Sequence, residues 1–268
     1  LRRGGHVGEV VGFGRSLGTL QKAVDLKVID RAAVSVADAA QGADMIVVAI
    51  PVGSMKAIFA QLAPALVGGA VLTDVGSVKG TVVDVAREAF GSRFGAFVPG
   101  HPIAGTEHSG VAASNADLFD KHRVILTPES ETDETAVARV RAMWEATGAK
   151  VTLLSIEQHD AVLAACSHLP HMLAYALVDM LVRRDDHRLT FDLAAGGFRD
   201  FTRIASSDPV MWRDICLAND KLIVELLRDF RDNLDALTDA ITRRDSEWLM
   251  QTFERAKHAR DAYVKREE

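Results

Sequence analysis

The stretch Val98–Gly110 gathers the side chains that are best placed for chemistry. It reads Val-Pro-Gly-His-Pro-Ile-Ala-Gly-Thr-Glu-His-Ser-Gly and follows Phe94–Val98, an apolar run typical of a short buried strand. Ligands of open α/β sheets bind beyond the carboxyl ends of the strands, where a glycine-rich loop would hold His101. A histidine titrates near neutral pH and can accept a proton from a substrate hydroxyl. The alternative is that His101 only bonds a backbone carbonyl in a tight loop.

Three further groups of residues have types suited to binding or catalysis. Thr106 and Glu107 follow His101 and could hydrogen-bond a small polar molecule. Ser77 lies between an expected strand and an expected helix, where a serine commonly caps the helix. His168 and His171 are three positions apart on one helical face, a spacing that could hold a metal ion. No third ligand is suggested by spacing, so we expect no metal.

The elements expected around these residues alternate between strands and helices as far as residue 154. The run Asp44–Ile50 is continuously apolar, as in a strand covered on both faces, and such alternation predicts a parallel α/β sheet. Beyond it the pattern is helical, with Pro170 expected to kink or divide a long helix over residues 156–184. We therefore predict an α/β domain over residues 1–155 and an all-α domain over residues 156–268.

The α/β half has the order expected of a Rossmann-like dinucleotide-binding domain, except at its start. Such a domain opens with a strand and a Gly-x-Gly-x-x-Gly turn. Here Gly12-Phe-Gly14 ends a strand, but no third glycine follows at the right spacing. Omitting a central first strand would leave long unpaired edges inside the sheet. We therefore expect that the first strand and the glycine-rich turn are missing from this sequence.

The cofactor preference depends on the residues after the strand at Glu9–Phe13. An acidic residue there favours NAD, whereas an arginine accepts the 2′-phosphate of NADP. The stretch Gly14-Arg15-Ser16 is small, basic and hydroxylated, which favours NADP over NAD. The alternative is a solvated arginine beside a helix-capping serine. The residues expected to bind the cofactor are Gly14, Arg15, Ser16, Pro51 and Ser77.

Five motifs, in order along the chain, resemble those of the prephenate and arogenate dehydrogenases of tyrosine biosynthesis. The first and most specific is His-Pro-Ile-Ala-Gly-Thr-Glu-x-Ser-Gly, which begins at His101. The others are Thr73-Asp-Val-Gly-Ser-Val-Lys79, Ser167-His-Leu-Pro-His171, Gly196-Gly-Phe-Arg-Asp-Phe-Thr-Arg203 and Asp208-Pro-Val-Met-Trp-Arg-Asp214. The resemblance spans nearly the whole chain.

This resemblance implies an oxidative decarboxylation of prephenate or arogenate, with hydride transfer to a nicotinamide. His101 matches the catalytic base, and Ser77 would bond His101 or the substrate hydroxyl. Arg203 matches the arginine that pairs with a substrate carboxylate, and His168 a substrate-binding histidine, whereas His171 is expected in the core. Arg199 and Asp200 match residues that reach the neighbouring subunit's site, so a homodimer is implied. Trp212 could cover the pocket or belong to the core.

The composition narrows the class of protein. The chain has 268 residues, 48% of them hydrophobic and 25% charged, as in ordinary globular proteins. A net charge of −6 without a basic run argues against a nucleic-acid partner. We find no apolar run near the roughly 20 residues that span a bilayer, and no signal peptide. With only two cysteines, a reducing, cytoplasmic location is expected.

Two other functions remain open from the sequence. Another two-domain hydroxyacid dehydrogenase would want a catalytic lysine at the start of the helical half, and none occurs in helix 156–184. A non-catalytic dimeric binding or regulatory protein could have kept the fold. The intact set of His101, Ser77 and Arg203 argues against that reading.

Overall fold

The computed structural model describes residues 1–66, 68–105 and 110–265. These residues divide into two compact units, Leu1–Leu222 and Ile223–Glu268. Thr106 and Glu107, named above as binding candidates, lie outside the described residues.

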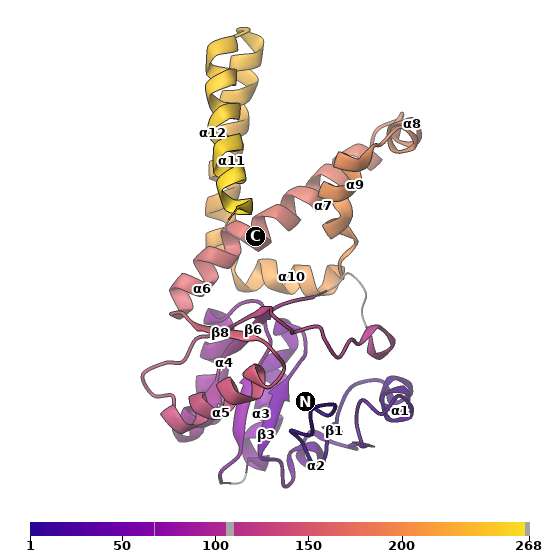
Figure 1. The fold of residues 1–268 in the computed structure, drawn as a ribbon, viewed down its shortest axis with the longest axis vertical. Coiled ribbons are helices and arrows are strands. Elements are labelled where there is room, and N and C mark those ends of the chain that lie inside the picture. The colour runs from indigo at the N-terminus through magenta and orange to yellow at the C-terminus, as the bar shows by residue number, and fades with distance from the viewer. Residues whose placement is uncertain (67, 106–109, 266–268) are drawn as a thin grey trace. The chain divides into compact units, whose positions relative to one another are not determined.

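Strands and helices alternate through the first part of the larger unit, as the sequence predicts (Figure 1). Two short elements, β2 and α2, were not expected, because two-residue strands and one-turn helices give little periodicity. The strands are β1 (Val11–Gly12), β2 (Arg31–Ala32), β3 (Met45–Val48), β4 (Val71–Asp74), β5 (Phe97–Val98), β6 (Gly100–Ile103), β7 (Arg123–Leu126) and β8 (Lys150–Leu153). The helices are α1 (Leu17–Asp25), α2 (Val36–Ala40), α3 (Met55–Ala65), α4 (Gly80–Phe90) and α5 (Glu134–Glu145).

The strands form three hydrogen-bonded groups, ordered β1-β2, β3-β4-β5 and β6-β7-β8. All pairs are parallel except β6 with β7, so the prediction of a wholly parallel sheet was wrong there. It was also wrong to place His101 in a loop, because His101 pairs with Ile125 inside β6. Pro102, which lacks an amide hydrogen, is tolerated because β6 is an edge strand.

Gly100 explains how the chain changes direction between β5 and β6. A Cβ atom at this position would lie 3.0 Å from the carbonyl oxygen of Asp74 and 3.1 Å from the hydroxyl of Thr73. Only a residue without a side chain passes the end of β4 so closely. The glycine and proline that suggested a loop therefore permit a tightly packed strand.

Alternate residues of β4 and β5 pack into different cores, which is the periodicity of a sheet buried on both faces. Leu72 and Phe97 join α3 and α4 in one core, where the rings of Phe59 and Phe97 lie 5.5 Å apart, centroid to centroid. Val71 and Val98 join α5 and β7 in the other core. Helices thus cover both faces of β4 and β5, and the two strands are packed between two hydrophobic cores.

The strand signal ends at β8, and a long helical run follows. Ser155 and Gln158 form a capping box at the start of α6 (Ile156–Leu163). A π-helical turn, η4 (Ala164–His168), leads directly into α7 (Leu169–Val182). Pro170 therefore lies in the first turn of α7, directly after the π turn, where the sequence predicted a kink or a division of the helix.

This run, Ile156–Val182, contains an 18-residue window with a mean hydropathy of 1.5 and is long and apolar enough to cross a membrane, judged by length and composition only. The prediction that no segment approaches that length was wrong, because the few polar residues hardly lower the average. Three of those polar side chains, His159, Asp160 and His168, are buried within the larger unit. They contribute to the site described below.

The remaining helices are shorter until the end of the chain. They are α8 (His187–Asp192), α9 (Gly196–Thr202), α10 (Pro209–Ala218), α11 (Asp220–Thr242) and α12 (Ser246–Val264), with a 3-10 turn, η5 (Arg203–Ser206), before α10. Residues 243–245 reverse the chain, so that α12 runs opposite to α11 (Figure 1).

A buried ion pair fixes the segment between β4 and α4. The side chains of Lys79 and Asp74 are both fully buried, and the Lys79 ammonium donates to the Asp74 carboxylate and to the carbonyl oxygen of Gly100, 2.7 Å away. Burial lowers the pKa of Lys79 although Asp74 opposes the shift. The same carboxylate accepts the amides of Gly76 and Gly100. One pair therefore joins the end of β4 to the start of β6.

We predict that Lys79→Met destabilises the protein by about 3–5 kcal/mol, because it leaves a buried carboxylate without its cation. Urea denaturation followed by circular dichroism measures the loss. Lys56→Met is the matched control, since Lys56 pairs with Glu88 while both side chains are about two-thirds exposed. That variant should lose less than about 1 kcal/mol. Similar losses in the two variants would contradict the role assigned to Lys79.

Candidate active site

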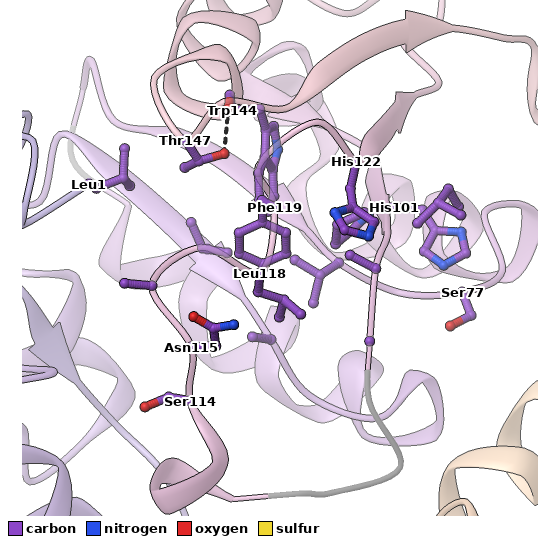
Figure 2. Close-up of a pocket in the computed structure, with 18 of the residues that line it drawn as sticks. Leu1, Ser77, His101, Ser114, Asn115, Leu118, Phe119, His122, Trp144 and Thr147 are labelled. Atoms are coloured by element: carbon purple, nitrogen blue, oxygen red, sulfur yellow. Dashed lines mark hydrogen bonds between the residues drawn. The ribbon is translucent and has the colours of Figure 1, made fainter. Parts of the chain in front are cut away.

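A cavity of about 1460 Å³ opens at the carboxyl ends of the central strands in the larger unit (Figure 2). Val47 and Ala49 at the end of β3, Val75 after β4 and His101 in β6 line one part of it. The helical half contributes a second group of lining residues, which includes Ser167, His171, Arg203 and Trp212. The cavity therefore lies where ligands bind to open α/β folds.

His101 lies in the wall of this cavity and is 9% exposed. Its pKa is well below the usual value near 6.5, first because of burial and then because of electrostatic interactions with Lys79, His159 and His168. The imidazole is thus neutral at neutral pH and has a lone pair available. This is the protonation state that a general base requires.

His159 and Asp160, which the sequence analysis did not single out, lie directly behind His101. His101 Nδ1 is 2.9 Å from His159 Nε2, and His159 Nδ1 is 2.7 Å from Asp160 Oδ1. The sequence feature that could have revealed these two residues is a His-Asp pair in the first turns of a helix whose buried face includes Leu163. It passed unnoticed because no motif spacing links residues 101 and 159.

Asp160 also completes the start of α4. Its two carboxylate oxygens accept the backbone amides of Lys79 and Gly80, each at 2.8 Å. Burial, the largest influence, raises the pKa of Asp160, but the hydrogen bonds from His159 and these two amides outweigh it and lower the pKa. Asp160 is therefore ionised at the positive end of a helix.

Ser77 lines the same cavity as His101, and both are drawn on one side of it in Figure 2. The prediction that Ser77 caps the helix was wrong, because α4 begins only at Gly80 and Asp160 takes the capping role. The expected bond between Ser77 and His101 is not formed through His101 Nδ1, which contacts His159. Ser77 is left half-buried on the wall.

The two histidines of Ser167–His171 take the places opposite to those expected. His168 is 1% exposed and does not line the cavity; Asn219 Nδ2 lies 3.3 Å from its Nδ1 atom. His171 lines the cavity, with Nδ1 2.9 Å from the Ser167 carbonyl oxygen and its ring stacked at 3.7 Å on Trp212. The π turn, which ends at His168, changes the phase of the helix between the two histidines and the residues before it, and single-sequence spacing does not reveal this.

The remaining substrate candidates divide into two groups. Arg203, at the start of η5, and Trp212, in α10, line the cavity, and the Trp212 side chain is 6% exposed. Arg199 and Asp200 are exposed on α9 and are not among the residues that line it. The structure thus brings together His101, Ser77, Arg203 and Trp212, which come from opposite ends of the motif series.

The cofactor candidates follow the carboxyl ends of three parallel strands. Gly14, Arg15 and Ser16 follow β1, Pro51 follows β3 and Ser77 follows β4. Ser16 caps α1, accepting the amide of Thr19 at 3.2 Å. Of the five candidates only Ser77 lines the cavity. The position of these ends fits a dinucleotide, which binds in the crevice beyond such strands.

We predict that His168 makes the stability of the protein depend on pH. Burial is the main reason that its pKa is lowered from 6.5 to about 4. The unfolded chain therefore binds this proton first, and stability falls as the pH drops from about 6.5 to about 4. His168→Gln should remove up to about 3 kcal/mol of that dependence, measured by urea denaturation across the range. His258→Gln, at an exposed position on α12, should keep the wild-type slope; an unchanged slope in His168→Gln would contradict the prediction.

Comparison with known proteins agrees with this geometry. Residues 1–153 match the family model of the prephenate dehydrogenase nucleotide-binding domain, and residues 155–255 match that of the prephenate dehydrogenase dimerization domain. The cyclohexadienyl dehydrogenase of Zymomonas mobilis is 39% identical over 225 residues, which cover 83% of this chain and 76% of the relative. The prephenate dehydrogenase of Bacillus subtilis is 39% identical over 241 residues, 89% of this chain but 65% of the relative.

A solved structure extends the similarity to three dimensions. The prephenate dehydrogenase of Aquifex aeolicus, in complex with hydroxyphenyl propionate and NAD+, has a TM-score of 0.89 and 40% identity, covering 97% of this chain and 90% of that one. The predictions of a Rossmann-like N-terminal domain and a helical C-terminal dimerisation domain are confirmed. This chain belongs to the prephenate dehydrogenase family.

Proposed function

We propose that this protein catalyses the oxidative decarboxylation of prephenate or arogenate in tyrosine biosynthesis. The observation that carries the proposal is a neutral, buried His101 in the wall of a cavity that also holds the cationic Arg203. A ring alcohol needs a proton acceptor when it is oxidised, and a carboxylate substrate needs a cation inside a largely apolar cavity. Family membership supports the same reaction.

In the proposed reaction His101 Nε2 accepts the proton of the ring hydroxyl as the carbonyl forms. When bound, the nicotinamide supplies a hydride acceptor for the carbon that bears this hydroxyl. The bond to the ring carboxylate then breaks, its electron pair enters the ring to form the aromatic product, and carbon dioxide leaves. The proton on His101 returns to the phenolic oxygen, so the histidine is restored in each turnover.

Other residues would orient the substrate. Arg203 pairs with a carboxylate through its planar guanidinium, and Ser77 hydrogen-bonds the reacting hydroxyl. Trp212 forms part of the wall together with the stacked His171 ring. The proposal keeps a substrate-binding role for Thr106, Glu107, Arg199 and Asp200, the last two at the site of a partner subunit. His168 would act from behind the wall, because it does not line the cavity.

We propose NADP as the preferred cofactor, with NAD as the alternative. Arg15 is exposed directly after β1, where the 2′-phosphate of NADP would be met. The Ser16 oxygen already accepts the Thr19 amide, but its hydroxyl hydrogen remains to donate to a phosphate. Gly14 and Pro51 would contact the cofactor through the backbone.

We propose that the protein is cytoplasmic and forms a homodimer. We also propose that each chain has two domains, residues 1–155 and 156–268. The apolar helix Ile156–Val182 exposes Val162, Met180 and Val182, which a second copy would cover. Sedimentation would measure the oligomeric state.

The function is tested by the absorbance of reduced nicotinamide, with prephenate and arogenate each supplied with NAD and with NADP. Reduction with one pair would establish the activity, the substrate and the cofactor together. Folded, dimeric protein that binds these molecules but reduces no cofactor would support the non-catalytic reading instead.

We predict that His101→Asn and Arg203→Ala fail in different ways. His101→Asn should lower kcat about 10²–10⁴-fold, because general-base catalysis is lost, while the substrate KM changes little. Arg203→Ala should raise KM by about 100-fold, since a carboxylate loses its cation. Steady-state kinetics separates the two. An equal loss of NADP affinity in both variants would contradict the assigned roles.

The low pKa of His101 also predicts how kcat/KM depends on pH. The base works only when it is unprotonated, so activity should persist below pH 6.5 and be lost as the pH falls through the lowered pKa. A profile of kcat/KM between pH 4.5 and 9 would check this; an acid limb centred at or above about pH 6.5 would contradict it.

A further inference from the structure

His101 is the outermost member of a buried chain of hydrogen bonds. His101 Nδ1 contacts His159 Nε2, and His159 Nδ1 contacts Asp160 Oδ1, at 2.9 and 2.7 Å. The His159 side chain is fully buried, so no water competes for its two nitrogens. The chain ends at the amides of Lys79 and Gly80, which bind the same carboxylate.

The direction of each hydrogen bond follows from the ionised end. A carboxylate can only accept, so His159 Nδ1 carries a hydrogen and donates it to Asp160. With that hydrogen on Nδ1, His159 offers the lone pair of Nε2 and accepts a hydrogen bond from His101 Nδ1. His101 Nε2 is left without a hydrogen. The geometry thus assigns one tautomer, the one whose second nitrogen is basic.

We propose that Asp160 and His159 are positioning residues that hold His101 in its basic tautomer and balance the charge that it gains on accepting a proton. This proposal rests on the proposed function. Lys79, His159 and His168 disfavour a positive charge on His101, and Asp74 compensates only for Lys79. The negative charge of the Asp160 carboxylate, two hydrogen bonds away, favours the protonated His101 ring and so opposes the effect of these three residues. No proton has to leave His101 along the chain, because the phenolic oxygen takes it back.

Capping alone does not explain this arrangement. The amides of Lys79 and Gly80 occupy one position on each oxygen of Asp160, and the His159 hydrogen bond is a third. A residue that only caps α4 would not need His159, whose two ring nitrogens contact His101 and Asp160. Both His159 nitrogens are used, and both point along the path from Asp160 to His101.

The decisive variants are Asp160→Asn and His159→Phe. An asparagine amide keeps an acceptor for one amide of α4, but it can donate to His159 and so reverse the chain, which places the hydrogen on His101 Nε2. We expect kcat to fall at least about 100-fold in both variants, as when a base is held in the wrong tautomer. Substrate KM and cofactor Kd should change less than about threefold.

The pH profile gives a readout that a purely structural role would not move. In Asp160→Asn the residual activity should have its acid limb at lower pH than in the wild type, because the negative charge that favours the protonated ring is gone. Asp133→Asn is the matched control: Asp133 caps α5 by accepting the amide of Thr135, away from the cavity. It should keep the wild-type kcat and pH profile.

A direct measurement of the tautomer separates this proposal from the proposed function. Nitrogen-15 NMR of histidine-labelled protein should show His101 and His159 with hydrogen on Nδ1 and none on Nε2, assigned with His101→Asn and His159→Phe. In Asp160→Asn the His101 signal should change to the other tautomer. This pattern would support the chain even if no substrate pair were turned over. Hydrogen on His101 Nε2 in the wild type, or kcat within threefold of wild type in folded Asp160→Asn, would overturn the proposal.

Discussion

The buried Lys79 ammonium is the constraint on which the site depends. It lies between the carboxylate of Asp74, at the end of β4, and the carbonyl oxygen of Gly100, at the start of β6. A charge in such a place is tolerated only when it is paired and fully hydrogen-bonded. The pairing therefore fixes the distance between two segments, one carrying Ser77 and the other His101. The placement of Ser77 relative to His101 therefore depends on this one cation.

The same cation creates an electrostatic problem for His101. Burial makes the protonated His101 ring less stable, and the positive charge of Lys79 adds to the effect. The Asp160 carboxylate, which His159 separates from His101, offsets this effect. Its ionised form is stabilised by the amides at the start of α4. Asp74 and Asp160 thus have separate tasks: the first neutralises Lys79, and the second faces the histidine pair.

The sequence was sufficient for elements with long, regular patterns. β3 is an apolar run, as expected of a strand covered on both faces, and the four residues from Ser155 to Gln158 contain the capping box that begins α6. β6 was missed because glycine and proline usually mark loops, and the reason they form a strand here is a close approach of Gly100 to β4. A contact between residues 74 and 100 leaves no local trace in the sequence.

The site residues, like the secondary structure, could be predicted from the sequence only in part. His101, Ser77 and Arg203 lie in motifs, and the structure brings all three to one cavity. We expected His168 at the substrate and His171 in the core, whereas His171 lines the cavity and His168 does not. A π turn shifts the helical phase here, and no residue type in the sequence indicates such a turn. His159 was missed because its importance comes from a partner 58 positions away. Local pattern finds the residues that touch a ligand more readily than those that stand behind them.

His101 and Arg203 differ in solvent exposure, which bears on the orientation of a substrate in the cavity. Arg203 is exposed, whereas His101 is almost fully buried in the same cavity. An anionic group can pair with Arg203 while it keeps part of its hydration, and the uncharged hydroxyl can enter the drier end. The reverse orientation would bury a carboxylate beside a neutral imidazole, away from the cation. Under the proposed function, this difference in burial favours a substrate whose carboxylate faces Arg203 and whose hydroxyl faces His101.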